Sequence, residues 1–333
     1  MKRKICRLYY SFKFGGVYYV YLRIFDKIRK NDNALKFLYK KSKEVGSEQY
    51  EKELINIFGL KTGLRLNFKK PQTFNEKIQW MKLYDTTPLK VTLTDKYLVR
   101  EWVREKIGEQ YLISLLGVWD HFADIEIRKL PDKFALKINH GSGWNLIVKK
   151  KADIIWEKVQ EQFDYWMSLN YAYTDGFEMQ YLNISPKIIA EEYIENENGN
   201  LYDYKIHCFN GIPRYIHIIG NRKFDMHCAK EAFYDVDWQL LPFTSGVYLQ
   251  YDENIEKPKR LEEMLEIAKK LSEEFIYVRV DLYELTNGVI KFGEMTFTPG
   301  SGFYQWEPAE MDKILGEKII LPIKKVNESA KDQ

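Results

Sequence analysis

The spacing of apolar residues predicts that residues 1 to about 130 are mostly helical. Ser47 is a suitable N-cap for a helix whose apolar residues fall on one face, and we expect Gly59 to end that helix. Thr73 and Glu76 have the spacing of a capping box, in which each side chain accepts a hydrogen bond from a free backbone amide of the first turn. The first third of the chain is therefore expected to be a set of helices.

The pattern changes after residue 131, where the order becomes strand, glycine loop, strand, helix and strand until about residue 195. From about residue 200, strands and Asn-Gly turns dominate, with one clear helix from Leu261 to Phe275. The chain thus divides into a helical first part and a strand-rich remainder, without an internal repeat or a long linker.

Two strands near the C-terminus are joined by Asn287-Gly288, which favours a two-residue type I′ turn because both residues tolerate positive φ. Counting back from this turn places Asp281 opposite Glu294 and Arg279 opposite Thr296. Side chains on one face of a sheet recur every second residue, so these four side chains are expected to share one face.

Two carboxylates that face each other across a ladder, with Cβ atoms roughly 5 Å apart, repel unless a cation lies between them. Carboxylate oxygens suit Mg²⁺, which commonly takes one or two carboxylates together with substrate phosphates. The alternative is an exposed hairpin in which Arg279 neutralises one acid. The loop Pro299-Gly300-Ser301-Gly302 follows directly, and its backbone amides are expected to form an anion-binding nest. The segment therefore predicts a site for Mg-nucleotide and an acidic co-substrate.

A second phosphate signal lies in the glycine loop Gly141-Ser142-Gly143, which follows a strand that carries Lys137. No Gly-Lys-Ser/Thr leads into a helix, so this is not a P-loop. A glycine hairpin can instead fold over phosphates, with Lys137 as a point charge beneath it, although a plain hairpin turn is the alternative.

The turn Asn210-Gly211 predicts one more hairpin, and the same count places His207 opposite Arg214 and Lys205 opposite Ile216. Asp203, Lys205, His207 and Arg214 would then share a face. So many charges are expected either in solvent or against an anion.

Composition limits the class of protein. With 30% charged and 45% hydrophobic residues, 333 residues suit a globular chain of two or three lobes, and a net charge of +3 gives no reason to expect nucleic-acid binding. Cys6, Cys208 and Cys228 show no paired spacing, so neither a disulfide framework nor a zinc site is expected, and the cytoplasm is the default location. The 24 Tyr, 19 Phe and 8 Trp suit stacking on a sugar or base, or simply a core.

The N-terminus is basic and aromatic. The apolar run from Phe14 to Leu22 is too short to span a bilayer, and no small-residue cleavage site follows it. The cations before Tyr9-Tyr10 are Lys2, Arg3, Lys4 and Arg7. Such a segment can lie on an anionic membrane, peripherally at its inner face, or dock on the protein's own body, and docking is the preferred interpretation.

Taken in order, these segments resemble the ATP-grasp superfamily. The matching pieces are Asp95-Lys96, Lys137 with its glycine loop, Glu191-Glu192-Tyr193-Ile194, Asp203 with Lys205, Arg279-x-Asp281 and Glu294-x-Thr296. The run from Phe292 to Gly302, together with that from Thr73 to Lys77, is similar more narrowly to the TupA-like ATP-grasp proteins. That family is found among genes for bacterial capsule and cell-wall polysaccharide assembly. The resemblance covers roughly Pro71 to Pro322.

The resemblance implies an α+β fold of the ATP-grasp type, in which two α+β lobes clasp a nucleotide behind a mostly helical N-terminal region. Residues 1–70 would form a helical extension that can lie on a membrane surface, and residues 71–130 the helical first part of the ATP-grasp module. Residues 131–198 would form the lid lobe with its glycine-rich loop, and residues 199–325 the core lobe with the metal site.

The resemblance also implies a role for each matching residue. Nucleotide binding is implied for Lys96, Lys137, Gly141, Ser142, Gly143, Glu191, Glu192, Tyr193, Ile194 and Asp203. Catalytic roles, chiefly neutralising the transferred phosphate, are implied for Lys205, Arg279 and Ser301. Mg²⁺ ligation is implied for Asp281, Glu294 and Thr296. Thr296 departs from the superfamily, which commonly has Asn there, and it offers a single oxygen.

The implied function is that of an ATP-dependent carboxylate–amine ligase that forms an amide through an acyl-phosphate. ATP and Mg²⁺ would be its cofactors, and a uronic acid or amino acid would supply the carboxylate or the amine. No Ser, Cys or His nucleophile with a partnered base is visible, so a covalent enzyme intermediate is not expected. Two alternatives stay open: a sugar or small-molecule kinase, and a nucleotide-sugar glycosyltransferase that uses Asp235-Val236-Asp237 as its metal motif.

Overall fold

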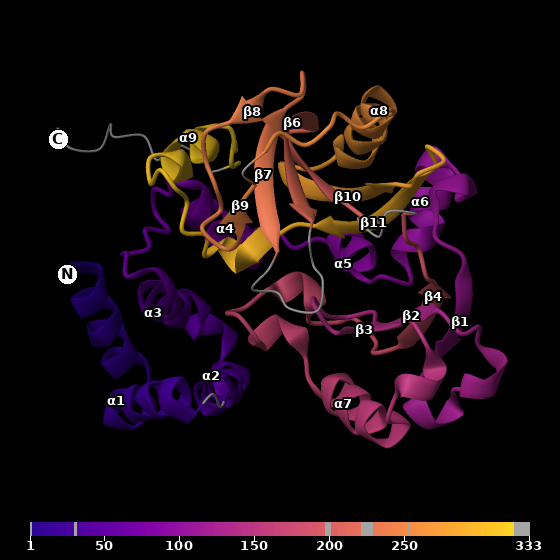
Figure 1. Cartoon of the computed structure of the whole chain (residues 1–333). Coiled ribbons are helices and arrows are strands. Elements are labelled where there is room, and N and C mark those ends of the chain that lie inside the picture. The colour runs from indigo at the N-terminus through magenta and orange to yellow at the C-terminus, as the bar shows by residue number, and fades with distance from the viewer. Residues whose placement is uncertain (1, 30–31, 197–200, 221–228, 252, 323–333) are drawn as a thin grey trace.

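The computed structural model describes residues 2–29, 32–196, 201–220, 229–251 and 253–322. Within them the strands form a four-stranded and a seven-stranded sheet, and the helices of the N-terminal part lie beside both (Figure 1). Short 3-10 helices lie at Ser47–Gln49, Glu109–Tyr111, Phe122–Asp124, Ile127–Lys129, Lys151–Asp153, Tyr171–Tyr173, Met179–Tyr181 and Pro299–Gly302.

The N-terminal helices are α1 (Lys2–Arg29), α2 (Asn33–Glu44) and α3 (Tyr50–Thr62). α1 bends at Gly15-Gly16, where the backbone leaves the helical conformation. The prediction that Gly59 ends its helix is wrong, because α3 continues to Thr62 and Gly63, with φ 74°, ends it. Gly59 instead gives α1 room, since a Cβ there would collide with the ring of Tyr10.

The next helices are α4 (Phe74–Tyr84), α5 (Pro88–Thr94) and α6 (Val99–Ile107). The capping box of Thr73 and Glu76 is confirmed at the start of α4. α4 packs against α9 (Met311–Glu317) near the C-terminus, where the backbone amide of Asn75 donates to Asp312 Oδ1 at 2.9 Å. The first turn of α4 is thus fixed by a residue far along the chain.

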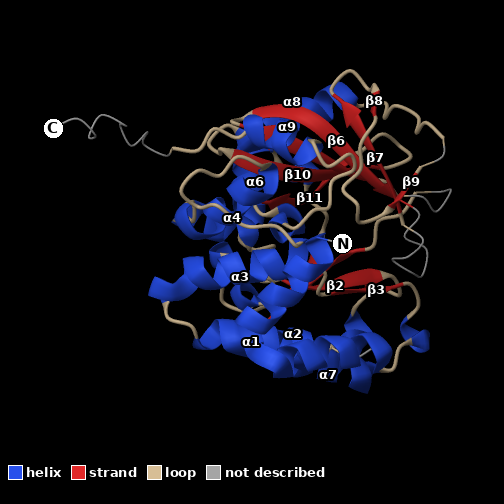
Figure 2. Ribbon diagram, turned by 90° about the vertical axis from the view of Figure 1, so that its left-hand side faces the viewer, coloured by secondary structure: helices blue, strands red, loops and turns tan. Residues whose placement is uncertain are grey.

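The small sheet has the order β1-β4-β2-β3, with all neighbours antiparallel. Its strands are β1 (Leu115–Trp119), β2 (Phe134–Ile138), β3 (Asn145–Val148) and β4 (Ile188–Glu192). Helix α7 (Trp156–Ser168) covers the face of this sheet that points away from the large sheet (Figure 2). β1 lies inside the segment expected to be helical, so the small sheet begins before residue 131.

The large sheet has the order β11-β10-β5-β6-β7-β8, and β9 pairs with β7. Its strands are β5 (Asp203–Phe209), β6 (Ile212–Gly220), β7 (Lys230–Asp235), β8 (Leu240–Leu241), β9 (Leu249–Gln250), β10 (Tyr277–Glu284) and β11 (Ile290–Thr296). Helix α8 (Leu261–Ser272) packs on one face of this sheet and ends three residues before the predicted Phe275. The opposite face carries the polar residues described below.

The β10–β11 hairpin has the predicted register at the residues that matter, with Asp281 opposite Glu294 and Arg279 opposite Thr296. The turn itself is one residue longer than predicted, because Leu285 N donates to Val289 O at 2.9 Å and only Gly288 of the Asn-Gly pair has positive φ. A bulge between Asp281 and Leu282 then shifts the pairing back by one residue. The two deviations cancel.

The β5–β6 hairpin shows the opposite outcome. Asn210 and Gly211 have φ 49° and 76°, as the predicted turn requires, but a bulge between His207 and Cys208 shifts the register beyond it. Lys205 therefore faces His217 rather than Ile216, and His207 faces Tyr215 rather than Arg214. The predicted face that included Arg214 is wrong, and Arg214 is exposed.

Candidate active site

Strands β5, β10 and β11 bring four charged side chains together on one face of the large sheet. This strand cluster consists of Lys205, Arg279, Asp281 and Glu294. Arg279 donates from Nε and Nη2 to the two carboxylate oxygens of Asp281, both at 2.7 Å, and Nη2 lies 3.3 Å from Glu294 Oε1. Lys205 binds Asp281 on the other side and Asp203 at 2.7 Å. Arg279 thus lies between the two facing acids.

The strand cluster is not the exposed hairpin of the alternative interpretation, because Asp281 is 1% and Arg279 7% exposed. Burial raises the pKa of Asp281 despite its two cationic neighbours. Burial alone would raise the pKa of Glu294 too, but the positive charges of Lys96, Lys205 and Arg279 lower it to about 2. Glu294 is therefore an ionised carboxylate whose side chain is one-third exposed.

Lys96 joins the two lobes at this place. Its ammonium lies 4.0 Å from Glu294 Oε2 and donates to the carbonyl oxygen of Gly141 in the glycine loop. Burial lowers its pKa. The structure thus brings Lys96, the glycine loop and Glu294 into contact, as the sequence order implied.

Lys137 and Glu191 bind each other at 2.6 Å, and Arg100 binds the second oxygen of Glu191 at 2.9 Å. Lys137 is thus paired with an acid of the neighbouring strand β4. Glu192 is exposed at the end of β4, and Tyr193 and Ile194 follow it. The nucleotide roles of all these residues, and that of Asp203, stay predictions.

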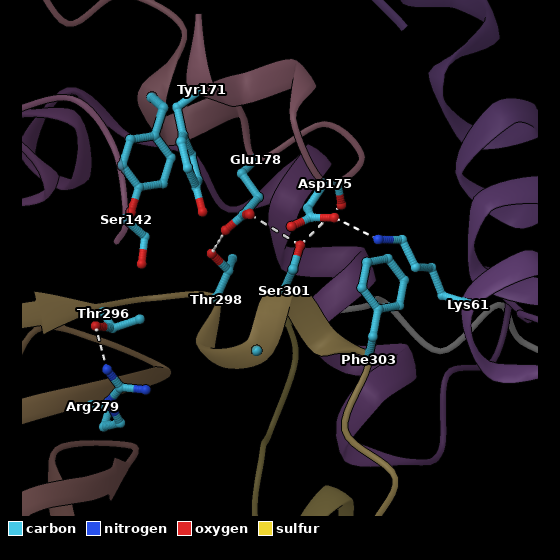
Figure 3. A pocket seen from close by; sticks show the side chains of 12 residues that line it. Lys61, Ser142, Tyr171, Asp175, Glu178, Arg279, Thr296, Thr298, Ser301 and Phe303 are labelled. Atoms are coloured by element: carbon cyan, nitrogen blue, oxygen red, sulfur yellow. Dashed lines mark hydrogen bonds and ion pairs between the residues drawn. The ribbon is translucent and has the colours of Figure 1, made fainter. Parts of the chain in front are cut away.

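A cavity of about 320 Å³ lies beside the strand cluster (Figure 3). It opens between the glycine loop, the ends of β10 and β11, the segment around residues 171–181, and α3. Its lining residues are Lys61, Ser142, Tyr171, Asp175, Glu178, Tyr181, Arg279, Thr296, Thr298, Gly300, Ser301 and Phe303. The predicted residues Ser142, Arg279, Thr296 and Ser301 therefore meet around one cavity.

A second group of polar side chains lies at this cavity, with Lys82 and Glu178 buried and Asp175 and Ser301 half-buried. This loop cluster consists of Lys82, Asp175, Glu178 and Ser301. Lys82 donates to Ser301 Oγ at 2.7 Å, and Ser301 Oγ lies 3.0 Å from Glu178 Oε1 and from the carbonyl oxygen of Asp175. Thr298 donates to the other oxygen of Glu178, and Lys61 binds Asp175 at 2.7 Å.

Burial determines the pKa shifts of Lys82 and Glu178, but not that of Asp175, whose pKa is lowered by Lys61 and Lys82 despite burial. Burial lowers the pKa of Lys82, whose side chain is fully buried, to about 8. It raises the pKa of Glu178 although Lys82 and the hydroxyls of Thr298 and Ser301 act in the other direction. Glu178 is therefore a carboxylate that takes up a proton more readily than a solvated glutamate.

The turn after β11 differs from the predicted anion nest. Gly300, Ser301 and Gly302 all have positive φ, between 52° and 66°. The amides of Ser301 and Phe303 donate to Thr298 O at 2.9 Å and Gly300 O at 3.0 Å, so they are used within the turn. The turn presents the hydroxyls of Thr298 and Ser301 to the cavity rather than a full set of amides.

Lys61, Lys82, Asp175 and Glu178 were missed from the sequence. Lys82 carried a visible signal, because it lies one helical turn after Ile78 on the apolar side of α4, where a lysine needs a partner. Asp175 and Glu178 lie in a loop with no periodicity, next to Gly176 and Phe177, which both have positive φ. No local pattern could have paired this loop with α4.

The family model of the TupA-like ATPgrasp proteins matches residues 76–320, which include both clusters. The chain belongs to this family. The resemblance and the α+β fold of the ATP-grasp type are thereby confirmed, whereas residues 1–75 lie outside the match. A comparison with curated proteins found no match.

Three similar solved structures are ligases by description. D-alanine–D-alanine ligase from Bacillus anthracis, complexed with ATP, is 18% identical, with a TM-score of 0.38 over 63% of this chain and 56% of that one. L-amino acid ligase from Bacillus licheniformis is 14% identical, with a TM-score of 0.45 over 74% and 55%. The ATP-grasp ligase PsnB, complexed with a precursor variant, Mg and ADP, is 9% identical, with a TM-score of 0.39 over 73% and 65%. This chain therefore spans less than two thirds of each.

Proposed function

We propose that this protein is an ATP-dependent carboxylate–amine ligase that forms an amide through an acyl-phosphate. The observation that carries the proposal is the cavity itself, which has Arg279 and Thr296 of β10 and β11 on one side and Asp175 and Glu178 on the other. A cation suits an acidic substrate, and a pair of acids suits an ammonium group. One cavity therefore has complementary places for both partners of an amide bond.

The donor set fits Mg²⁺ that takes most of its ligands from phosphate. No group of three or more His, Cys, Asp or Glu that could hold a metal occurs within the described parts of the chain. Glu294 is ionised and partly exposed, and Thr296 Oγ1 lies 3.1 Å from its Oε1, so Glu294, Thr296 and Asp281 are the residues that would hold the ion. Mg²⁺ commonly binds through one or two carboxylates plus phosphate oxygens. When bound, it would neutralise charge on the phosphates.

The cations of the strand cluster suit phosphoryl transfer. The attacking oxygen would belong to a substrate carboxylate next to Arg279, and the bond to the γ-phosphate would form as the bond to ADP breaks. Arg279, Lys205 and Lys96 would stabilise the charge on the transferred group, because fixed cations in a water-poor site need no reorganisation. The acyl-phosphate would then lie in the cavity.

The loop cluster suits the second step. The ammonium group of the other substrate would bind Asp175 and Glu178 and lose a proton to Glu178, whose raised pKa makes it a better base. The amine would then attack the acyl carbon, a C–N bond would form, and inorganic phosphate would leave. Tyr171, Tyr181 and Phe303 supply apolar walls that exclude water, which an acyl-phosphate requires.

The substrates proposed are those of capsule or cell-surface polysaccharide assembly, with a uronic acid or amino acid as the carboxylate. Hydroxyls of Ser142, Thr298 and Ser301 line the cavity beside aromatic rings, which suits a polyhydroxylated or zwitterionic molecule. The proposed cellular location is the cytoplasm, where ATP is available.

The Asp235-Val236-Asp237 motif of the glycosyltransferase alternative has a structural role in the turn that follows β7. Asp235 Oδ1 accepts from the amides of Asp237 and Gln239 at 3.0 and 2.8 Å, so Asp235 closes the turn after β7. The kinase alternative keeps the same ATP site and differs only in the acceptor oxygen.

The test is a screen of uronic acids against amino acids, read as ADP release, with product analysis of each hit. We expect ADP and inorganic phosphate in equal amounts with the amide, and a hydroxamate when hydroxylamine replaces the amine. A phosphorylated sugar as the stable product would establish the kinase instead.

The variant Glu178→Gln separates the two steps. It should slow amide formation while hydroxamate formation persists, because hydroxylamine is largely unprotonated at neutral pH and needs no base. Equal loss of both products would place Glu178 in the first step and contradict its proposed role.

A further inference from the structure

Helix α1 has apolar residues on two faces, and only one of them is covered. Tyr10, Phe14, Tyr19 and Leu22 are buried against α2 and α3. The docked interpretation of this segment is therefore confirmed for this face.

The other face of α1 is exposed and carries large apolar side chains. We call it the α1 stripe; its members are Ile5, Leu8, Tyr9, Phe12, Val17, Tyr18, Tyr21 and Ile24. Each is between 56% and 73% exposed. In the first half of α1 they recur at intervals of three and four residues, so Ile5, Leu8, Tyr9 and Phe12 form one continuous strip. Exposed apolar patches of this kind mark interaction sites.

The charges around the α1 stripe have one sign. Residues 1–25 contain no acid, and their cations are Lys2, Arg3, Lys4, Arg7, Lys13 and Arg23. At about 100° per residue, Lys4 and Lys13 fall on the two borders of the strip formed by Ile5 to Phe12, and both are exposed.

We propose that the α1 stripe docks on an anionic membrane surface. Helices that lie in a lipid interface have apolar and aromatic residues on one face and Lys or Arg beside them, and tyrosine is enriched at the headgroup level. Protein interfaces, in contrast, are depleted in lysine, so a second copy of the chain is the poorer match. No helix in the described residues is long and apolar enough to cross a membrane, so α1 would lie on the surface.

The α1 stripe is separate from the catalytic module. It lies wholly outside the residues 76–320 that match the family. α1 packs on α2 and α3, which also lie outside the match (Figures 1 and 2). α3 contributes Lys61 to the cavity, next to Gly59 and Thr62, which contact Tyr10 and Arg7 of α1. The exposed members of the α1 stripe do not line the cavity, so the proposal does not depend on the proposed reaction.

The test is flotation of the full chain with vesicles of phosphatidylcholine alone or with phosphatidylglycerol. We expect binding to the anionic vesicles that falls as salt is added. Leu8→Glu with Phe12→Glu should lower the partition coefficient at least tenfold, because it places two acids in the stripe. A matched control, Ile212→Glu with Leu249→Glu, changes two exposed apolar residues of the large sheet and should bind like the wild type.

A second variant tests the charges alone. Lys4→Gln with Lys13→Gln keeps the apolar strip and should weaken binding about fivefold for each charge removed. Melting temperatures must match the wild type for each variant, which excludes misfolding as the cause. Absence of binding to anionic vesicles, or equal binding by the Leu8→Glu/Phe12→Glu variant, would overturn the proposal. A dimer that this variant dissociates, without vesicle binding, would instead show an interface between copies.

Discussion

The strand cluster and the loop cluster are both groups of charged and polar side chains around one cavity, but they are assembled in different ways. Lys205, Arg279, Asp281 and Glu294 lie on three adjacent strands, where the two-residue repeat and the pairing register fix their neighbours. The loop cluster collects Lys82 from α4, Asp175 and Glu178 from an irregular segment, and Ser301 from the turn after β11. The first follows from local rules, whereas the second exists only once the whole chain has folded.

The pKa of the glutamate in each cluster is shifted in opposite directions. Three cations near Glu294 overcome the effect of burial and lower its pKa, whereas around Glu178 burial prevails and raises it. Pairs of titratable groups whose environments separate their pKa values are typical of acid–base assignments in active sites. The comparison therefore suggests that Glu294 works as an ion and Glu178 as a proton acceptor.

The largest expected effect comes from Glu294→Gln. We expect turnover to fall roughly 10²- to 10³-fold, the loss typical of removing one electrostatic contact to a transition state. Stability at neutral pH should fall less than on loss of a fully buried ion pair, because the side chain is partly exposed and solvent screens its charge. The measurements are ADP release and the melting temperature.

Asp281→Asn is the contrasting variant. It should also remove turnover. In addition, the buried cations Arg279 and Lys205 would lose the carboxylate that both of them bind, so the free energy of unfolding should fall. Wild-type turnover in either variant would contradict the assignment of the strand cluster to phosphate and metal.

The contrast between a cluster built on neighbouring strands and one built from distant segments also explains which parts of the fold and site could be predicted from the sequence. The family and the Asp281–Glu294 pairing came from short motifs and strand counting. The β5–β6 register failed because a bulge is invisible in the sequence, and β1 was missed because Leu115–Trp119 shows no clear alternation. The loop cluster depends on long-range packing, which no local pattern encodes.

The second effect concerns stability and arises in the loop cluster. Lys82→Met should destabilise the protein by about 1–3 kcal/mol, since it removes the buried donor to Ser301 Oγ and the Asp175 carbonyl oxygen and the positive charge near Glu178. The double variant Lys82→Met/Glu178→Gln should recover part of this loss, because no buried charge remains unpaired. Lys52→Met, an exposed lysine of α3, is the control. Additive losses in the double-mutant cycle would show that Lys82 and Glu178 do not interact.

A smaller effect is expected from Lys61→Met. Lys61 comes from the N-terminal extension and binds Asp175 at the cavity, where its side chain is 29% exposed. We expect KM for the amine substrate that contacts Asp175 to fall, by up to about tenfold, because its ammonium group no longer competes with Lys61 for that carboxylate, with KM for ATP unchanged. Lys52→Met should change neither constant. An equal rise of both KM values would mean that Lys61 acts on the fold rather than on one substrate.

The smallest effect is the pH dependence of stability, which should have opposite signs in the two clusters. The lowered pKa of Glu294 means that the unfolded chain binds more protons between about 2 and 4.5, so its contribution to stability grows with pH there. The raised pKa of Glu178 means that the folded chain binds more protons above 4.5, so its contribution falls with rising pH up to that raised pKa.

Melting temperatures of the wild type, Glu294→Gln and Glu178→Gln between pH 3 and 7 measure these contributions. Relative to the wild type, Glu294→Gln should lose less stability as pH falls below 4.5, and Glu178→Gln should lose less as pH rises above it. Each pKa unit corresponds to about 1.4 kcal/mol, so the differences are modest. Parallel curves for all three proteins would show that the two glutamates titrate alike, and the distinction between an ionised ligand and a poised base would then be lost.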